Sequence, residues 1–556
     1  EATGEPEATI MLCVVPMRNT NPYKDEFGEL LELIFPYFVF MMYVMPLYRT
    51  IFSIVQEKQS GTRESMRMMG LFMSAYWISW LLFFIAIISM VTLSAFIILR
   101  INVFPHSNPL LLYMFYNTFG ISIFGYVVLS AALFSNPRIA SICGTLAYFV
   151  SGFLDNLAKQ EGINVFVQKL FSLFSTVAVS RGSSNISIFE SSKIGLQKHN
   201  LHNLYRHFRI SEMAMMMLLG MFIFTVIGIC LDTSFSSVGE QSSWICSKKR
   251  RPSKKAKSDP NFELKGISDK RNYEKVDASL HQQEDQDQIL KISNLQKTFE
   301  TGLHAVKGLN LKFYNGQIFA LLGHNGAGKT TTISMLTGIL TSDPGSAAEV
   351  LGYDLFEEMD EARHFMGVCP QHNILFDLLT PREHLEIFCE IKGVSYGDVN
   401  EEIDDMIDDV DLTTNENTLA KNLSGGNKRK LSVAIALIGG SEIVLLDEPT
   451  SGLDLGARRK LWNMLKNYKN DRIIILTTHY MDEADILGDR IGIMVNGEVI
   501  CLGSPLFLKN RFGVGYNLTM VKLEKTPNKQ IEQYLSKHLG KDVKKLSEVS
   551  NEISFQ

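Results

Sequence analysis

The sequence predicts a multi-domain fold, in which an α-helical membrane domain with several spans precedes an α/β domain that carries a phosphate-binding loop. Apolar runs recur along residues 31–232, and several have the roughly 20 residues that a helix needs to cross a bilayer core. The rest of the chain has an ordinary soluble composition. Within it, a glycine-rich loop directly follows an apolar strand pattern and opens a helical pattern, as phosphate-binding α/β folds require.

Length, charge and cysteine usage limit the classes of function. With 556 residues, the chain is long enough for about two to four domains. A net charge of -5 is small for this size, so no global field indicates nucleic acid as a partner. The seven cysteines show neither a CxxC motif nor a paired spacing, which argues against a disulfide framework or a zinc site.

The membrane domain contains six apolar segments of unequal length. Lys and Arg residues follow the first, third and sixth segments, which places these loops on the cytoplasmic side. The number of crossings between the ends of the first and sixth segments must then be even. We therefore expect five spans and a re-entrant fifth segment. The segments lie at about 33–55, 75–99, 111–135, 139–154, 163–180 and 213–231.

Two polar stretches of this domain stand out. Residues 56–70, QEKQSGTRESMRMMG, are charged and compatible with a helix on the cytoplasmic side. They are either a solvated connector or a rigid amphipathic helix that transmits force to the membrane, and the sequence favours neither. Asn185-Ile186-Ser187 matches the pattern of an N-glycosylation acceptor in a predicted outside loop.

Residues 233–288 are predicted to be a flexible linker because they are polar and lack apolar periodicity. The linker is basic from Lys248 to Lys257 and acidic near its end. A basic run directly after the last span is typical of the cytoplasmic side, and this reading is favoured over a nuclear signal or a specific lipid headgroup site. The domain that follows is therefore expected in the cytoplasm of a multi-pass membrane protein.

The stretch GHNGAGKTT directly follows the apolar run of residues 317–322. Its glycines let backbone N–H groups converge on phosphate oxygens at the start of a helix. Lys329 can reach the terminal phosphates and Thr330 can ligate magnesium. The residues predicted to hold the phosphates of ATP are Gly323, Asn325, Gly326, Gly328, Lys329, Thr330 and Thr331.

A second apolar strand pattern, IVLL, ends in Asp447 and Glu448. In nucleoside triphosphatases with a phosphate-binding loop, an acidic residue at the tip of such a strand holds the magnesium shell, which suits Asp447. Glu448 is then placed to polarise an attacking water as a general base. These motifs predict ATP and Mg²⁺ as the cofactors of an ATPase.

The stretch LSGGN places a Ser-Gly-Gly turn at the start of an amphipathic helix, which is a second anion-binding device. A single chain does not need two such devices. Taken with the motifs above, this stretch resembles the ATP-binding cassette (ABC) family, and the resemblance covers residues 289–522. It implies that Ser424, Gly425 and Gly426 form the signature that completes the ATP site of the opposite cassette in a head-to-tail pair.

The same resemblance assigns further residues. Phe299 stands where the family has an aromatic that stacks on adenine, although tyrosine is commoner there. Gln371 resembles the glutamine that contacts magnesium and the water, and Asp454 belongs to a turn that looks like the loop joining two cassettes. His479 resembles the switch histidine that senses the γ-phosphate. The implied catalytic residues are Glu448, His479 and Gln371, and the implied magnesium ligands are Thr330, Gln371 and Asp447.

The sequence departs from the family pattern at two positions. Asn427 ends the signature where glutamine is common, and Leu455 replaces the proline that usually follows the Gly-Leu-Asp turn. Neither departure removes a phosphate ligand, so an active site is expected rather than a degenerate one.

The domain order resembles the A subfamily, because the membrane domain precedes the cassette and a re-entrant segment before the last span resembles the type II exporter architecture. EKQSGTRESMRMMGL and HYMDEADILGDRIGIM also resemble this subfamily. Its full-length members carry two halves, so we expect this chain to be one half of a longer protein. The expected parts are the end of an extracellular region, the transmembrane domain, the linker, the cassette and the start of a small regulatory domain, at residues 1–30, 31–232, 233–288, 289–525 and 526–556.

The resemblance implies ATP-driven transport across or out of a membrane, with phospholipids or sterols as the substrate class. The expected partners are a second ABC half, in the same polypeptide or another copy, and membrane lipids, but not nucleic acid. The alternative is a membrane-tethered ATP switch that gates a channel or regulates a partner, because both classes need the same cassette. An uptake system is the weaker option, because importers usually place the cassette on a separate chain.

Overall fold

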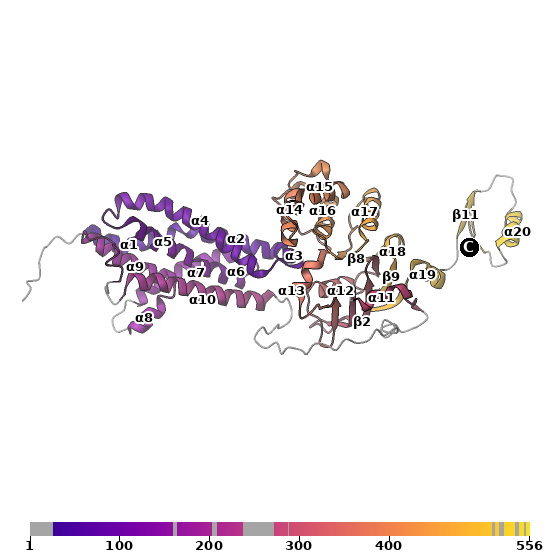
Figure 1. The fold of residues 1–556 in the computed structure, drawn as a ribbon, viewed down its shortest axis with the longest axis horizontal. Coiled ribbons are helices and arrows are strands. Elements are labelled where there is room, and N and C mark those ends of the chain that lie inside the picture. Colours follow the sequence, from indigo (N-terminus) through magenta and orange to yellow (C-terminus); the bar gives the residue numbers. More distant parts are fainter. Residues whose placement is uncertain are drawn as a thin grey trace, which may run out of the picture. The chain divides into compact units, whose positions relative to one another are not determined.

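The computed structural model divides into two compact units, and each is described by itself. The first comprises residues up to Gly61 together with Met73–Ser243, and the second comprises Thr62–Phe72 together with the residues from Trp244 onward. Figure 1 labels the elements of both. The structure describes residues 26–158, 164–202, 208–236, 272–286, 288–513, 517–521, 528–539, 544–549 and 552–555.

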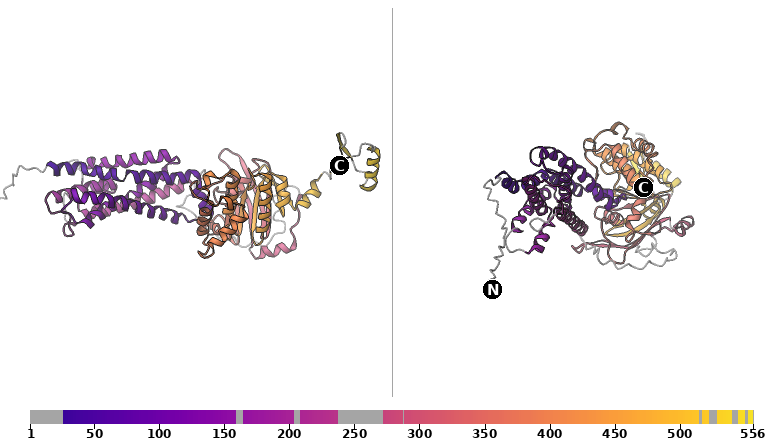
Figure 2. Two further views of the ribbon diagram at one scale, coloured as in Figure 1. Left: turned by 90° about the horizontal axis from the view of Figure 1, so that it is seen from above. Right: turned by 60° about the vertical axis from the view of Figure 1, so that its left-hand side comes forward.

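The elements of the first unit that the structure describes are all helices, and the long ones run side by side (Figure 2). Five stretches are long and apolar enough to cross a membrane, which matches the five spans predicted from the sequence by length and composition. They are Ile34–Ser60, Met73–Ile98, Pro109–Leu133, Pro137–Asn156 and Ile210–Ser234. The helices are α1 (Glu26–Met42), α2 (Val44–Ser60), α4 (Met73–Asn102), α5 (Pro109–Ser122), α6 (Phe124–Leu133), α7 (Pro137–Ala158), α8 (Val165–Phe171), α9 (Ser175–Ser191) and α10 (Ile210–Ser236).

Glycines allow α6 and α10 to pack closely. A Cβ atom at Gly125 of α6 would lie 3.0 Å from the carbonyl oxygen of Met221 in α10. A Cβ atom at Gly228 of α10 would lie 2.9 Å from the backbone nitrogen of Leu129 in α6. Small residues at helix contacts let backbones approach in a membrane, where packing rather than water exclusion holds helices together. Larger side chains at either position would push the two helices apart.

The predicted re-entrant segment 163–180 is two helices rather than one. α8 ends at Phe171, a turn covers residues 172–174, and α9 begins at Ser175. Although α9 is rich in serine and carries Arg181, most of its residues are buried. Asn185 is only 4% exposed inside this helix, so the expected outside loop around its glycosylation pattern is wrong. Whether α8 and α9 re-enter the membrane remains a prediction.

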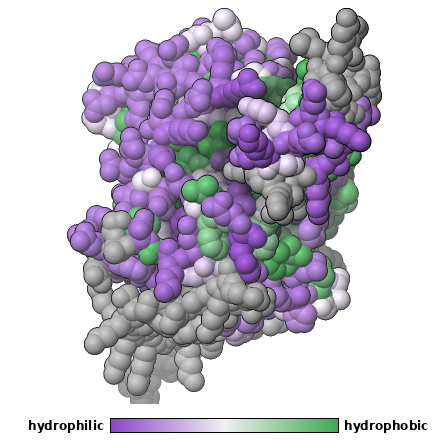
Figure 3. Space-filling model, turned by 90° about the vertical axis from the view of Figure 1, so that its right-hand side faces the viewer, coloured by the Kyte–Doolittle hydropathy of each residue, from purple (hydrophilic) through white to green (hydrophobic). Residues whose placement is uncertain are grey.

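The first unit exposes large apolar side chains along its long apolar helices. They include Phe38, Met90, Met215 and Phe222, each at least 65% exposed. Figure 3 shows a face of the molecule that is mostly hydrophilic, with apolar residues gathered in small patches. An apolar outer surface on apolar helices of spanning length is the composition that a bilayer solvates.

The second unit contains the predicted cassette, built on two sheets. A six-stranded sheet has the order β10-β9-β3-β8-β7-β6, and a four-stranded sheet has the order β2-β1-β4-β5. In the larger sheet, β6, β7, β8, β3 and β9 are parallel, and only β10 pairs antiparallel. The strands are β1 (Ile289–Thr298), β2 (His304–Tyr314), β3 (Gln317–Leu322), β4 (Ala347–Val350), β5 (Tyr353–Asp354), β6 (Met366–Cys369), β7 (Ile443–Asp447), β8 (Ile473–Thr478), β9 (Arg490–Val495) and β10 (Glu498–Gly503).

Helices cover the sheets of the cassette and bury their apolar residues in one core. The central strands β7 and β8 and the edge strand β6 are buried along their whole lengths, as parallel strands covered on both faces are. The helices are α12 (Lys329–Leu336), α13 (Met359–Ala362), α14 (Pro381–Lys392), α15 (Val399–Asp409), α16 (Gly425–Leu437), α17 (Leu455–Tyr468), α18 (Met481–Leu487) and α19 (Pro505–Phe512), with 3₁₀ turns at Arg363–Phe365, Thr413–Asn415 and Ala420–Asn422.

The helix α3 (Thr62–Met68) belongs to the cassette unit, although its sequence was assigned to the transmembrane domain. Met68 and Met69 are part of the cassette core, and the N–H of Val368 in β6 donates to the Sδ of Met69 at 3.3 Å. The ring of Phe72 lies 5.1 Å from that of His364. Residues 62–69 are therefore packed and are not a solvated connector.

The last part of the predicted linker is also folded. Residues 272–286 include α11 (Ala278–Asp285). The carboxylate of Glu284 accepts hydrogen bonds from Lys312 Nζ and from the hydroxyl of Tyr314, both at 2.8 Å. The prediction of a flexible linker up to residue 288 is wrong here, because a polar helix with little apolar content can still be held by a buried ion pair. The basic run lies outside the described residues.

The end of the chain forms a small separate sheet with the order β11-β13-β12. Ile553 and Phe555 are buried against Leu535 of its helix. The cassette was predicted to extend to residue 525, but residues 518–521 form β11, which pairs with β13 of this small sheet. The elements are β11 (Leu518–Val521), α20 (Asn528–Leu539), β12 (Lys545–Val549) and β13 (Glu552–Phe555).

Candidate functional site

The predicted site residues follow the carboxyl ends of neighbouring parallel strands. The phosphate loop follows β3, the segment with Gln371 follows β6, Asp447 and Glu448 end β7, and His479 follows β8. Because β6, β7, β8 and β3 are consecutive in the sheet, their carboxyl ends meet at one edge. Ligands of open α/β sheets bind in the crevice at this edge.

The phosphate loop has the backbone that its glycines allow. Gly326 and Gly328 adopt φ of 81° and 107°, in the left-handed region. A Cβ atom at Gly328 would lie only 2.5 Å from the carbonyl oxygen of Ala305. The Nζ of Lys329 donates to the carbonyl oxygens of Gly323 and His324 at 2.8 Å and 3.1 Å. Burial lowers the pKa of Lys329, while Glu448 and Asp447 oppose this shift.

Asp447, the last residue of β7, contacts the start of α12, the helix that follows the phosphate loop. Its Oδ1 accepts from the hydroxyl of Thr330 at 3.3 Å, and it also accepts from Thr477 of β8. Burial raises the pKa of Asp447, while the hydrogen bonds from Thr477 and Thr330 oppose this shift. The predicted pair of magnesium ligands, a hydroxyl and a carboxylate, is thus brought together.

Glu448 adopts φ of 49°, which is uncommon for a residue with a side chain. Its N–H donates to the hydroxyl and to the carbonyl oxygen of Thr477 at 3.1 Å and 3.2 Å, so β8 holds this backbone in place. The Oε1 of Glu448 lies 3.2 Å from the Nδ1 of His479. Backbone strain of this kind gathers at functional sites, where the surrounding structure fixes it.

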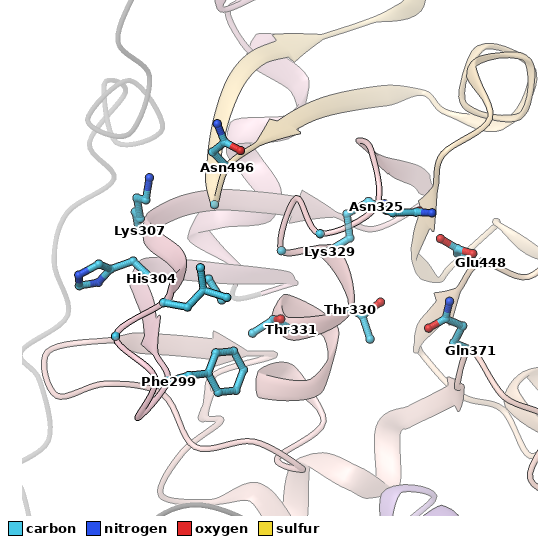
Figure 4. A pocket seen from close by; sticks show the side chains of 16 residues that line it. Phe299, His304, Lys307, Asn325, Lys329, Thr330, Thr331, Gln371, Glu448 and Asn496 are labelled. Carbon is cyan, nitrogen blue, oxygen red and sulfur yellow. The ribbon is translucent and has the colours of Figure 1, made fainter.

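A cavity of about 690 Å³ joins most of these residues. Figure 4 shows Phe299 and His304 toward one end and Glu448 and Gln371 at the other, with Thr330 and Thr331 between them. The lining residues are Phe299, Gly302, Leu303, His304, Ala305, Lys307, Asn325, Gly326, Gly328, Lys329, Thr330, Thr331, Gln371, Glu448, Asn496 and Gly497.

The signature residues and Asp454 lie outside this cavity. The Oγ of Ser424 accepts from the N–H of Asn427 at 3.2 Å and caps α16, and Gly425 is exposed. The Oδ2 of Asp454 accepts from Gly456 and Ala457 at 3.1 Å and caps α17. These residues are therefore absent from the lining of the chain's own cavity.

Several lining residues were missed by the sequence reasoning. His304 is the first residue of β2, and Lys307 lies three residues further along this strand. Asn496 and Gly497 form the turn between β9 and β10. The Asn-Gly pair predicts a tight hairpin turn, but no sequence pattern places that turn beside the phosphate loop. Arg429, only 2% exposed, was treated as one residue of a helical pattern.

The donor set fits a magnesium ion shared with a nucleotide. In the part of the chain that the structure describes, no group of three or more His, Cys, Asp or Glu could hold a metal ion by itself. Mg²⁺ is usually held by one or two protein ligands together with substrate phosphates. Thr330 and Asp447 supply such a pair through their contact at 3.3 Å, and Thr330 and Gln371 both line the cavity.

Two family models match this chain. The model described as "ABC transporter" matches residues 306–451, and the model described as "ABC-2 family transporter protein" matches residues 10–231. The chain belongs to the ABC transporter family. The family expected from the sequence motifs is thereby confirmed, and so is the fold class of a helical membrane domain with an ABC cassette.

Curated relatives of this ABC transporter chain are sub-family A members. ATP-binding cassette sub-family A member 17 of Mus musculus is 34% identical over 93% of this chain. The retinal-specific phospholipid-transporting ATPase ABCA4 of Homo sapiens is 36% identical over 91% of it. The chain spans 30% and 23% of the lengths of these two relatives.

Solved structures that match this ABC transporter chain are cassettes. An ATP-binding subunit of an ABC transporter is 24% identical, with a TM-score of 0.38, and the match covers 45% of this chain and 99% of that one. The dimeric structure of a bacterial ABC transporter cassette is also 24% identical, with a TM-score of 0.37 over 39% of this chain and 98% of that one.

Proposed function

We propose that this chain is one half of an ATP-driven membrane transporter, and that its cassette hydrolyses ATP together with a second cassette. The observation that carries the proposal is the single cavity lined by Phe299, the phosphate loop, Gln371 and Glu448. An aromatic ring toward one end and a carboxylate at the other suit an adenine and a terminal phosphate of one extended ligand (Figure 4).

The phosphate loop binds the nucleotide through its backbone N–H groups and through Lys329. Its glycines leave the backbone open to phosphate oxygens, and α12 presents its positive end to them. Bound Mg²⁺ would offset the negative charge that develops on the phosphates, and Thr330, Asp447 and Gln371 would hold it. Phe299 is 36% exposed, which leaves its ring face available for stacking on a base.

Glu448 accepts the proton of the attacking water. A general base must lie within hydrogen-bond reach of that water, and Glu448 lines the cavity on the same side as Gln371. His479, 3.2 Å from the carboxylate, orients it and donates toward the terminal phosphate. The backbone bonds to Thr477 keep Glu448 in this position before the reaction, so little reorganisation is needed.

A second cassette completes each ATP site. Ser424 and Gly425 are exposed at the N-terminus of α16, away from the chain's own cavity. A helix N-terminus with free N–H groups favours an anion, so this turn suits the phosphates held by a partner cassette. The greater length of the curated relatives supports a second half in the same polypeptide.

The decisive test is Glu448→Gln in the intact protein that contains this chain. We expect ATP turnover to fall by about 10²- to 10⁴-fold, because general base catalysis contributes this much. ATP binding should persist. The matched control is Glu442→Gln, since Glu442 is exposed just before the other end of β7 and should leave turnover unchanged. Unchanged turnover in Glu448→Gln would show that Glu448 is not the general base.

The substrate that we propose is a membrane lipid, with export or translocation as the direction. A relative 36% identical to this chain is described as a phospholipid-transporting ATPase. The first unit exposes apolar side chains along its helices, so a lipid substrate can reach it laterally from the bilayer. Multiple crossings, with the cassette on the cytoplasmic side, follow from the positive residues in the short loops.

Substrate-stimulated ATPase activity separates a lipid transporter from an ATP switch. The intact protein in vesicles of one neutral phospholipid is titrated with a second phospholipid or a sterol. A transporter of that lipid should show higher turnover and movement of the labelled lipid between leaflets. A switch that only gates a channel should show turnover that does not depend on the added lipid.

Force transmission through α3 is part of the same proposal. Met69 contacts β6, and Gln371 comes two residues after the end of that strand. A change at the nucleotide can therefore reach α3 along one short strand. This supports a force-transmitting role for α3, although residues 56–70 are not the single rigid helix of the sequence hypothesis, because Gly61 in the left-handed region separates α2 from α3.

A further inference from the structure

Arg429 is a buried cation that the chemistry described above does not use. It lies on α16, three residues after Gly426 of the signature turn, and it is only 2% exposed. A charge is rarely buried this deeply unless hydrogen bonds compensate for the loss of water. The partners of Arg429 therefore indicate what the side chain is for.

All three guanidinium nitrogens donate to backbone carbonyl oxygens. Nη1 donates to Pro370 at 2.6 Å and to Gln371 at 3.1 Å. Nη2 donates to Asp447 and, at 2.9 Å, to Glu448. Nε donates to Pro449 at 3.1 Å.

These carbonyls belong to two separate segments of the nucleotide site. Pro370 and Gln371 follow β6, whereas Asp447, Glu448 and Pro449 lie at the end of β7 and just beyond it. One rigid planar group thus fixes the backbone of the proposed water-contacting glutamine relative to that of the proposed general base. A planar fork of five N–H donors is the side chain suited to this task.

The same helix carries the signature turn at its N-terminus. α16 begins at Gly425, and Ser424 caps it. Asn373, two residues after Gln371, lies 3.3 Å from Nη1 of Arg429 and 3.4 Å from the hydroxyl of Ser432, also on α16. A helix moves as a rigid body over one turn, so a shift of the signature turn moves Arg429 with it.

We propose that Arg429 is a positioning residue, which couples the signature turn of this cassette to Gln371 and Glu448 of its own ATP site. When the nucleotide of a partner cassette binds the signature turn, Gln371 and Glu448 of this cassette's own ATP site are repositioned. Hydrolysis at the two sites is thereby coordinated. The inference rests on the proposed function, because it assigns a role within that reaction. Arg429 itself touches backbone only and takes no part in the chemical step.

The test compares Arg429→Met, Arg429→Lys and Lys430→Met in the intact protein with its second cassette, in lipid nanodiscs. Lys430 is the matched control because it is the next residue of α16, but its Nζ lies 3.0 Å from Asp411 on the surface. Each variant is measured for its Tm, for ATP binding without hydrolysis, and for kcat and KM of ATP turnover.

Arg429→Met should lower kcat by about 10- to 100-fold, because misplacing catalytic groups by about 1 Å has effects of this size. ATP binding and KM should stay near the wild-type values, since the phosphate loop is untouched, whereas Tm should fall because buried carbonyl oxygens lose their donors. The kcat of Arg429→Lys should lie between those of the wild type and Arg429→Met, because an ammonium offers three N–H donors in place of five. Lys430→Met should match the wild type.

Three outcomes would overturn the proposal. One is an unchanged kcat in Arg429→Met. Another is a joint loss of Tm, ATP binding and turnover, which would mean that Arg429 only holds the fold. The third is an equal defect in Lys430→Met. If Arg429→Met does not fold, Arg429→Lys decides by kcat and ATP binding: lower kcat with intact ATP binding supports the proposal, and any other result overturns it.

A double-mutant cycle tests the coupling itself. Ser424→Ala weakens the signature, and its effect on kcat should be smaller in the Arg429→Met background than in the wild type, since both act through one link. Independent, additive effects would refute the coupling. Glu448→Gln, prepared in parallel, separates the two levels: if it leaves turnover intact, the proposed function itself is contradicted.

Discussion

Two buried arginines, Arg181 of the membrane unit and Arg429 of the cassette, are held in different ways. In the membrane unit, Nε of Arg181 donates to the Oδ1 of Asp155 at 2.9 Å, and the guanidinium lies 4.4 Å from the centre of the Phe208 ring. Within the described residues, Nη1 and Nη2 of Arg181 find no hydrogen-bond partner. In the cassette, every nitrogen of Arg429 meets a carbonyl oxygen.

The difference reflects what each cation joins. Arg181 on α9 and Asp155 on α7 tie one helix to another through opposite charges, as Lys58 on α2 and Asp232 on α10 do at 3.1 Å. Arg429 ties a helix to two loops through their backbones. An ion pair between two helices fixes the position of one helix relative to the other. A cation bonded to backbone carbonyls also fixes the conformation of the loops that carry those carbonyls. The first kind should therefore act on stability alone, whereas the second should act on turnover as well.

The largest stability effect should come from Asp155→Ala. The substitution leaves the charge of Arg181, which is 6% exposed, without its carboxylate. Breaking a buried ion pair on one side typically costs about 3–5 kcal/mol, because the remaining charge stays buried and unpaired. Thermal unfolding of the intact protein in nanodiscs should show a clearly lower Tm, and the yield of folded protein should fall.

The matched variant for this pair is Asp155→Leu combined with Arg181→Met. Replacing both charges by apolar side chains of similar size is often close to neutral, so the double variant should recover most of the lost stability. A double variant as unstable as Asp155→Ala would show that the pair has a role beyond mutual compensation. That result would break the contrast between Arg181 and Arg429.

A smaller and local effect is expected from Glu284→Gln in the cassette. The Glu284 carboxylate anchors α11 through Lys312 and Tyr314, and both side chains of the ion pair are about 5% exposed. Hydrogen bonds to charged groups contribute about 1.5–3 kcal/mol, so α11 should detach more often. Amide hydrogen exchange of residues 278–285 should accelerate, while ATP turnover stays unchanged.

Glu349→Gln provides the control for α11. Glu349 pairs with Lys291 at 3.9 Å, and its side chain is 56% exposed. Exposed pairs contribute little to stability, so exchange in α11 should not change. If Glu284→Gln lowered turnover as well, then an ion pair in the cassette would also act on the reaction, and the distinction drawn above would be too sharp.

The site was largely predictable because its motifs are local. Gly328, Lys329 and Thr330 are consecutive. An apolar strand pattern that ends in Asp447 and Glu448 predicts that these two carboxylates lie at the carboxyl edge of a sheet. Length and hydropathy likewise suffice for the five apolar stretches, since spanning a bilayer sets a minimum helix length.

The features that sequence reasoning missed depend on tertiary contacts. The carbonyl partners of Arg429 are brought together by the sheet and not by spacing in the sequence. The stretch around Asn185 was expected in an outside loop, yet it belongs to α9, and tertiary packing buries its serines and Asn185. α3 has the composition of an exposed connector, and only its contact with β6 reveals that Met69 belongs to the cassette core.

The smallest effect concerns a buried group that the cassette keeps neutral. Nε2 of His384 accepts the N–H of Phe376 at 2.9 Å, and Nδ1 lies 2.8 Å from the carbonyl oxygen of Thr380, to which it donates. Burial lowers the pKa of His384, while the bond to Thr380 and the charge of Glu383 oppose this shift. Protonation would force Nε2 to give up the Phe376 bond, in the segment that follows Gln371.

Because the folded pKa of His384 lies below the ordinary value of about 6.5, the unfolded chain takes up this proton first as pH falls. Stability from the neutral ring is therefore full above pH 6.5 and is lost as pH falls through the folded pKa. His384→Gln should lose about 1 kcal/mol at pH 7.5, the worth of a backbone hydrogen bond, and should show a flatter decline of Tm toward pH 5. His202 is exposed, so His202→Gln should show the same dependence of Tm on pH as the wild type.

If Tm declined as steeply in His384→Gln as in the wild type, the ring of His384 would not titrate in the cassette. The acid sensitivity of the segment after Gln371 would then come from other groups.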